Sequence, residues 1–141
     1  MTRLKQLNKY PTGDCMRTVF ACLLNYDNPE LIPNFSTAKE GFTQSIEKWL
    51  KENNLEYIEI SGKEFFECPF TPIGYCGISG KSPRGEYNHI VVGRAYTVKK
   101  DDGLYREVEF LHDPSPFHDG KYIDGDIKWI GFLVRSLHGG K

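Results

Sequence analysis

Apolar and polar positions near the beginning of the chain follow the period of a helix. Over residues 15–24 (CMRTVFACLL), apolar side chains are spaced three and four apart, as on one buried helix face. The residues of this face are Met16, Val19, Phe20, Leu23 and Leu24. Asp14 stands directly before the run, where a side-chain oxygen often caps a helix, and Gly13 allows a sharp turn into it. We therefore predict a helix that begins at Cys15, with Asp14 as its N-cap.

A second helical pattern follows a short connection. Residues 31–35 (LIPNF) are typical of an extended segment. Residues 37–53 then repeat an apolar stripe at helical spacing, with charged residues on the opposite face. The stripe consists of Phe42, Ile46, Trp49 and Leu50. We predict a helix over about 37–53.

The pattern changes to that of strands in the rest of the chain. Short alternating, β-branched or aromatic runs occur at residues 55–60, 74–79, 87–98, 105–111 and 129–135. An Asp-Gly pair within residues 99–103 favours a hairpin turn between the third and fourth runs. Helices that precede an antiparallel sheet indicate an α+β domain, with N-terminal helices packed on the sheet. The length of 141 residues favours a single domain over residues 1–141.

Composition argues against several classes of function. The formal net charge is -1, so no strong field indicates a nucleic-acid partner or a polybasic membrane contact. No run approaches the roughly 18–20 apolar residues that a membrane span requires. The N-terminus lacks the apolar stretch of a signal peptide, so we expect a cytoplasmic protein without nucleic-acid or membrane partners. In that reducing compartment, most of the four cysteines should be small buried hydrophobes rather than disulfides.

Three residues carry candidate chemistry. Cys15 would occupy the first turn of a helix, where the helix dipole and free N–H groups stabilise a thiolate. His89 lies at the beginning of an apolar strand (NHIVV), and Asp113 closes the strand that follows the hairpin. Each also has an ordinary structural explanation: a core cysteine, a half-buried histidine and an Asp-Pro strand end. Only the ordered set favours a catalytic site.

That order resembles the papain-like superfamily of thiol proteases, and more narrowly the bacteriocin-processing peptidase domains of ABC exporters. The matching stretches are GDCMR at 13–17, NHIVV at 88–92 and HDP at 112–114. The chain also resembles a group of small bacterial and phage proteins with a GDC helix, an SPRG segment and an HDP. Here the SPRG segment is residues 82–85, and the likeness spans roughly residues 13–116.

The resemblance implies a papain-like fold and assigns roles. Cys15 would attack an acyl carbonyl, His89 would carry the proton, and Asp113 would orient the histidine. The family places a glutamine six residues before the nucleophile to hold the oxyanion, but here that position is Lys9. A small insertion at residues 10–13 would bring Gln6 or Asn8 into place, and we favour Gln6 together with the Cys15 backbone N–H.

Several further residues are candidates for binding. The GKSPRG segment at 80–85 lacks the earlier glycine of a phosphate loop, so we expect it to form a rim of the cleft. Arg84 in that rim would hold a substrate carboxylate or phosphate, or else be an exposed turn residue. Asp14 and Asn8, close to the nucleophile in sequence, are further substrate-binding candidates.

We expect neither a metal nor a cofactor. The residues that a zinc site would need are Cys68, Cys76, His112 and His118, and their spacing does not fit a standard knuckle.

Two classes of function remain open. The first is an enzyme that cleaves or transfers a peptide, isopeptide or other amide through a Cys15 thioester, with transglutaminase-like and deamidase chemistry included. The second is a non-catalytic module that holds a small ligand or a partner protein in the same cleft. Either could serve a phage-encoded antagonist of a host factor. The sequence leaves the oligomeric state open.

Overall fold

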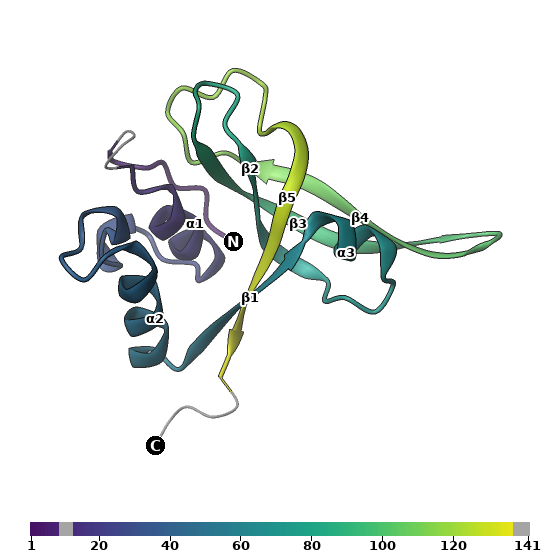
Figure 1. Ribbon diagram of the computed structural model, residues 1–141, viewed down its shortest axis with the longest axis horizontal. Coiled ribbons are helices and arrows are strands. Elements are labelled where there is room, and N and C mark those ends of the chain that lie inside the picture. Colours follow the sequence, from purple (N-terminus) through teal and green to yellow (C-terminus); the bar gives the residue numbers. More distant parts are fainter. Residues whose placement is uncertain (9–12, 137–141) are drawn as a thin grey trace.

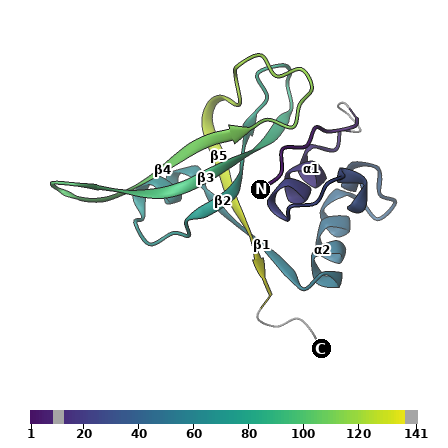
Figure 2. The same cartoon turned by 180° about the vertical axis from the view of Figure 1, so that it is seen from behind.

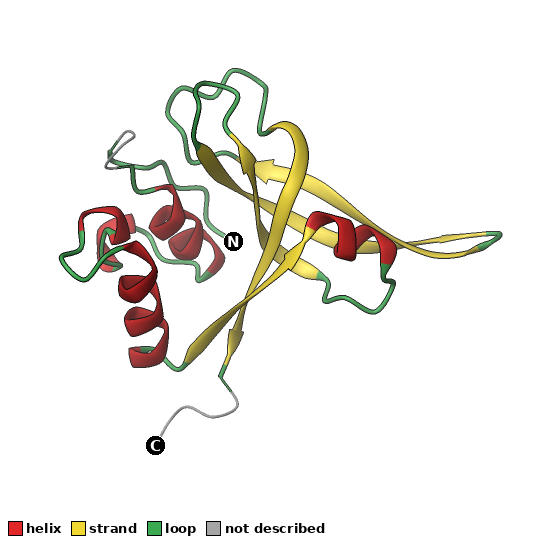
Figure 3. Cartoon of the chain, in the orientation of Figure 1, coloured by secondary structure: helices red, strands yellow, loops and turns green. Residues whose placement is uncertain are grey.

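The computed structural model describes residues 1–8 and 13–136 and has an α+β fold. Over these residues the structure contains three α-helices and a five-stranded antiparallel sheet (Figures 1 and 3). The helices are α1 (Cys15–Leu23), α2 (Phe42–Glu52) and α3 (Gly62–Glu67), with short 3-10 turns at Pro29–Leu31 and Phe35–Thr37. The strands are β1 (Leu55–Ser61), β2 (Gly74–Lys81), β3 (Asn88–Lys100), β4 (Gly103–His112) and β5 (Asp124–Arg135).

The sheet has the strand order β1-β5-β2-β3-β4. The last strand therefore inserts between β1 and β2, and β3 and β4 form a hairpin at one edge. The far half of this hairpin extends as an arm beyond the rest of the molecule (Figure 1). At its near end, the beginning of β3 contacts α1 and lies beside the end of β4. His89 is in this part of β3, and Asp113 directly follows β4.

Helices cover the two faces of the sheet unequally. Figures 1 and 2 show α1 and α2 together on one side of the sheet. Strand β3 separates two cores, since Ile90 and Val92 pack against Val19 and Cys22 of α1. The opposite core contains Phe65 of α3 with Cys76, Ile78, Val91, Ala95, Ile130 and Phe132. A third cluster joins α1 to α2 through Phe20, Ala21, Ile32, Phe35 and Trp49.

Tyr57 of β1 lies flat against the sheet on the α1 side. Two glycines make room for its ring, because a Cβ at Gly131 would lie 2.0 Å from the Tyr57 ring. A Cβ at Gly77 would lie 2.7 Å from the Tyr57 hydroxyl. The ring also packs against Phe20 of α1, with centroids 5.0 Å apart. Tyr57 therefore joins the helical layer to the middle of the sheet.

The predicted class is confirmed, and the differences in detail have local causes. The second helix begins at Phe42 rather than Thr37, because Asn34 caps a separate 3-10 turn and Gly41 adopts a positive φ of 96° before the helix. The segment predicted to be extended at 31–35 begins with the last residue of one 3-10 turn, Leu31, and ends with the first residue of the next, Phe35. Helix α3 was not predicted, and strand β5 begins five residues before the predicted 129.

Candidate active site

Asp14 occupies the N-cap position of α1 as predicted, but its side chain does not cap the helix. Its carboxylate makes no hydrogen bond to the helix N–H groups. Instead it accepts bonds from the backbone N–H groups of Leu7 and Asn8 at 2.9 Å and from Arg17 Nε at 3.0 Å. The Asp14 side chain is fully buried, which leaves no surface for a substrate. The Asp14 carboxylate therefore holds the N-terminal segment against the start of α1.

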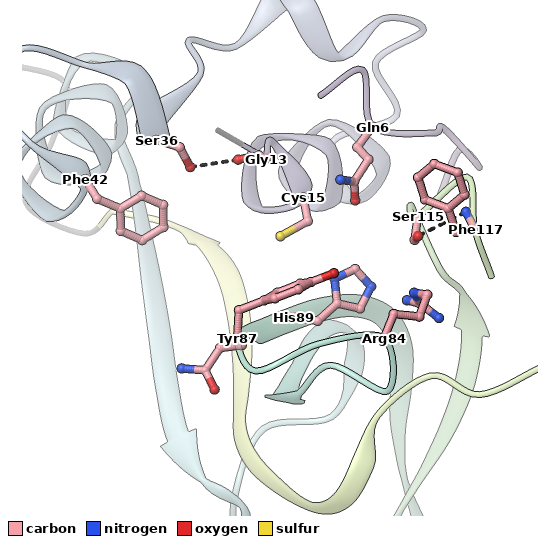
Figure 4. A pocket seen from close by; sticks show the side chains of 11 residues that line it. Gln6, Gly13, Cys15, Ser36, Phe42, Arg84, Tyr87, His89, Ser115 and Phe117 are labelled. Carbon is pink, nitrogen blue, oxygen red and sulfur yellow. Dashed lines mark hydrogen bonds between the residues drawn. The ribbon is translucent and has the colours of Figure 1, made fainter. Parts of the chain in front are cut away.

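Cys15 is the first residue of α1 and lines a cavity of about 410 Å³. Its thiol is partly exposed and interacts with the His89 ring closely enough to raise the pKa of that ring. Figure 4 shows the sulfur projecting into the space between α1 and the loop before β3. The cavity is lined further by Gln6, Gly13, Ser36, Phe42, Arg84, Tyr87, Asn88, Ser115 and Phe117. Cys15 is thus an accessible thiol at a helix start with an imidazole partner.

His89 stands between Cys15 and Asp113. Its Nε2 lies 2.7 Å from Asp113 Oδ1, and the residue is 5% exposed. Burial opposes a charge on the ring, but the interactions with Asp113 and with Cys15 outweigh it and raise the pKa of His89 to about 9. Because Nε2 is used by Asp113, Nδ1 is the ring nitrogen left for the thiol.

Asp113 follows β4 directly, and its buried carboxylate accepts four hydrogen bonds. Oδ1 accepts from His89 and from the Ser115 backbone N–H, while Oδ2 accepts from Arg84 at 3.0 Å and His118 at 2.9 Å. Burial would raise the pKa of Asp113. The bonds from His89, Ser115 and His118 outweigh burial and hold that pKa well below its usual range. The carboxylate is therefore a permanent negative charge behind the His89 ring.

Arg84 faces Asp113, not open solvent. Its guanidinium also bonds the Lys121 carbonyl at 3.3 Å, and only 16% of the side chain is exposed. The turn before β3 places it there, since Ser82 Oγ accepts the Arg84 N–H and the Ser82 N–H bonds the Tyr87 carbonyl. Arg84 lines the cavity, but its guanidinium is already paired with the Asp113 carboxylate. It is therefore not an unpaired cation that would attract a substrate anion.

Gln6 reaches the cavity from the N-terminal segment. Its backbone N–H donates to the Pro114 carbonyl at 2.8 Å, which fixes the segment beside Asp113. The side-chain Nε2 donates to the Asn8 carbonyl at 2.6 Å, and Oε1 is buried without a hydrogen-bond partner among the described residues. Since an amide nitrogen carries two hydrogens, one remains for a ligand above Cys15 (Figure 4).

The structure thus brings together five of the candidates named from the sequence, which are Cys15, His89, Asp113, Gln6 and Arg84. Asn8 does not line the cavity, because its backbone serves Asp14 and Gln6 and its side chain is exposed. Of the proposed insertion, residues 10–12 lie outside the described residues, as does Lys9. His118 was missed, because nothing in its spacing distinguishes it. Only the rule that a buried carboxylate collects several donors could have indicated it.

The remaining cysteines lie in different environments. Burial raises the pKa of Cys22 and raises that of Cys76 to about 12, as expected for inert core thiols. Cys68 is partly exposed at the end of α3. Within the described residues, no group of three or more His, Cys, Asp or Glu side chains is arranged to hold a metal ion.

Comparison of the chain with protein-family models, curated proteins and solved structures found no match. In residues 1–8 and 13–136, no helix is both long enough and apolar enough to cross a membrane.

Proposed function

We propose that this protein is a cysteine-dependent hydrolase or acyltransferase, papain-like in arrangement, that acts on a peptide, isopeptide or other amide bond. The observation that carries the proposal is the placement of His89 between the Cys15 thiol, which helps to raise the pKa of the ring, and Asp113, which lies 2.7 Å from its Nε2. A thiol, an imidazole and a carboxylate in this order are what nucleophilic acyl transfer requires. Cys15 and His89 line a cavity that is large enough for a substrate backbone.

The geometry supports a two-step reaction. Because the raised pKa of His89 keeps the ring protonated near neutral pH, the thiol proton is on Nδ1 before attack. The Cys15 sulfur then attacks the carbonyl carbon, while Asp113 holds the Nε2–H and balances the imidazolium charge. Gln6 Nε2 and the Cys15 backbone N–H are the donors for the developing oxyanion. The imidazolium then gives its proton to the leaving amine, which leaves a thioester on Cys15. Water or a second amine, deprotonated by His89, attacks the thioester and restores the thiol.

Selective alkylation tests the first requirement. An ordinary thiol is only a few per cent ionised at pH 7, so a Cys15 paired with His89 should react with iodoacetamide at least about tenfold faster. Cys68 is the matched control, because it is partly exposed as Cys15 is. Peptide mapping by mass spectrometry gives both rates in one sample. Equal rates at Cys15 and Cys68, or a Cys15 rate unchanged by His89→Ala, would contradict the proposal.

Turnover tests the second requirement. A library of fluorogenic peptide amides should contain members that the wild-type protein cleaves. Cys15→Ala should abolish that cleavage without changing the circular dichroism spectrum, because the substitution is small and lies at the mouth of a cavity. Activity that survives Cys15→Ala would exclude the thioester mechanism.

The alternative is a binding module that uses the same cleft. One observation favours it: the Gln6 amide donates to Asn8 in this structure, so the oxyanion donor is partly engaged. A binding module would keep its ligand affinity in Cys15→Ala and His89→Ala and show no acyl-enzyme by mass spectrometry. An enzyme would accumulate a Cys15 adduct with a slow substrate.

A further inference from the structure

The cavity at Cys15 continues under Phe42 into a second space of about 220 Å³. Phe42, which lines both spaces, lies on one side of the thiol in Figure 4, whereas Arg84 and Phe117, which line only the first, lie on the other. Phe42 lines both spaces, and the residues that line only the second are Met16, Glu59, Ser79, Ile90 and Trp129; we call this space the Glu59 subsite. Cys15 and His89 line it as well, so a substrate held here is next to the nucleophile.

Strand register explains why these side chains meet. Glu59 of β1 is opposite Gly131 of β5, and Trp129 of β5 is opposite Ser79 of β2. Cross-strand partners share a face of the sheet, as do residues two apart on one strand. Glu59, Trp129 and Ser79 therefore all lie on the face that carries Tyr57, toward α1. Gly131 has no side chain that could separate Glu59 from Trp129.

The subsite combines apolar walls with one uncompensated acid. Phe42 and Trp129 are each 45% exposed, so both rings present free apolar surface. Within the described part of the chain, the Glu59 carboxylate makes no ion pair and no hydrogen bond. Partial burial raises the pKa of Glu59, as expected for a carboxylate that lacks a cation. The Arg84 charge across the cleft is matched by Asp113.

We propose that the Glu59 subsite binds a basic side chain, lysine or arginine, of a peptide or protein substrate whose neighbouring carbonyl is attacked by Cys15. The inference rests on the proposed function. Alkyl stems pack well on aromatic rings while their charged ends seek an anion, and Phe42, Trp129 and Glu59 offer both. The cation also gains from the faces of the rings.

Small thiol reagents of opposite charge test the subsite without any turnover. Cys15 is treated with aminoethyl methanethiosulfonate, which is cationic, and with sulfonatoethyl methanethiosulfonate, which is anionic. Both reagents react with the same thiol, so a change in its intrinsic reactivity affects both rates equally. The ratio of the two rates therefore reports the charge near Cys15. In Glu59→Gln we expect this ratio to fall at least about fivefold, because the lost carboxylate attracts the cationic reagent and repels the anionic one across a wet cleft. The ratio should also fall with added salt.

Glu56→Gln is the matched control. Glu56 lies on the same strand but on the opposite face of the sheet and outside the subsite, and it loses the same charge. Its ratio should stay at the wild-type value. An unchanged ratio in Glu59→Gln, or an equal fall in Glu56→Gln, would overturn the subsite.

Peptide substrates separate this inference from the proposed function. Peptide amides that differ only in lysine, norleucine or glutamate beside the scissile bond should be cleaved in that order of kcat/KM, and Glu59→Gln should remove the preference for lysine over norleucine. Cleavage without that preference would overturn the subsite and leave the enzyme standing. A charge ratio that depends on Glu59 in a protein without turnover would keep the subsite and overturn the enzyme.

Discussion

At the scale of single residues, the site depends on how the two oxygens of Asp113 are shared. Oδ1 orients His89 and is braced by the Ser115 N–H, while Oδ2 is held by Arg84 and His118. A carboxylate with this many donors cannot rotate without losing several bonds. In the proposed reaction, Arg84 and His118 would be positioning residues, since they bond the carboxylate that holds His89.

Asp113→Asn removes the charge on which this arrangement depends. We expect the unfolding free energy to fall by about 3–5 kcal/mol, as when one partner of a buried ion pair is lost. The pKa of His89 should fall from about 9 toward its ordinary range, because Asp113 is the first group that raises it. Urea unfolding and NMR titration of the ring measure the two effects. Asp119→Asn is the control, since its carboxylate is largely exposed and lies 3.7 Å from Arg84. A similar loss there would contradict the special role of Asp113.

The raised pKa of His89 makes stability depend on pH. The folded protein holds the imidazole proton up to about pH 9, whereas the unfolded chain releases it near pH 6.5. This contribution is fully present below pH 6.5 and is lost as pH rises to about 9, by up to about 3 kcal/mol. Urea titrations of wild type and His89→Gln between pH 6 and 9.5 measure it as the difference between the two curves. Ionisation of Cys22 and Cys76 cancels in that difference. Parallel curves would show that folding does not shift the titration of His89.

At the scale of elements, the sequence predicted what depends on periodicity and missed what depends on tertiary partners. The apolar spacing around Phe20 and the alternation in the strands predicted α1 and the sheet. Helix α3 has only six residues, too few for a helical repeat to be read, and its Phe65 is buried against the sheet. Asp14 met the sequence rule for a cap, but Arg17 and the N-terminal segment compete successfully for its carboxylate. His118 is positioned by Asp113, a contact that no local pattern encodes.

The packing of the Tyr57 ring of β1 over Gly131 of β5 can be tested by substitution. Gly131→Ala should lower the unfolding free energy by about 1–3 kcal/mol, because the new Cβ would overlap the Tyr57 ring. In a Tyr57→Val background the same substitution should cost less than about 1 kcal/mol, since the ring is gone. A double-mutant cycle by urea unfolding gives the coupling directly. Equal costs in the two backgrounds would mean that Gly131 is required for another reason.

At the scale of the whole molecule, the N-terminal segment ties the helical layer to the hairpin. The Thr2 N–H donates to the Cys22 carbonyl of α1 at 3.0 Å. Lys5 Nζ donates to the Asp113 and Ser115 carbonyls at 3.0 and 3.1 Å. Cys15 belongs to the helical layer, whereas His89 and Asp113 belong to the hairpin and the residue that follows it. Residues 1–8 therefore help to hold the two halves of the site together.

Lys5→Met tests whether the N-terminal segment and the segment that follows β4 stabilise each other through Lys5. The substitution keeps an unbranched apolar stem but removes both donors from the segment that follows β4. We expect hydrogen exchange at the Gln6 and Ser115 amides to rise together, by about fivefold to tenfold, because both belong to the junction that Lys5 braces. Amides in the middle of β3 and β4 should be unaffected. Arg94→Ala in β3 removes an exposed pair with Glu109 and a contact with the Tyr96 ring, and it should leave Gln6 and Ser115 unchanged. A rise confined to Ser115 would show that the segment is held from α1 alone, and the two halves of the site would then depend on the sheet-to-helix core for their alignment.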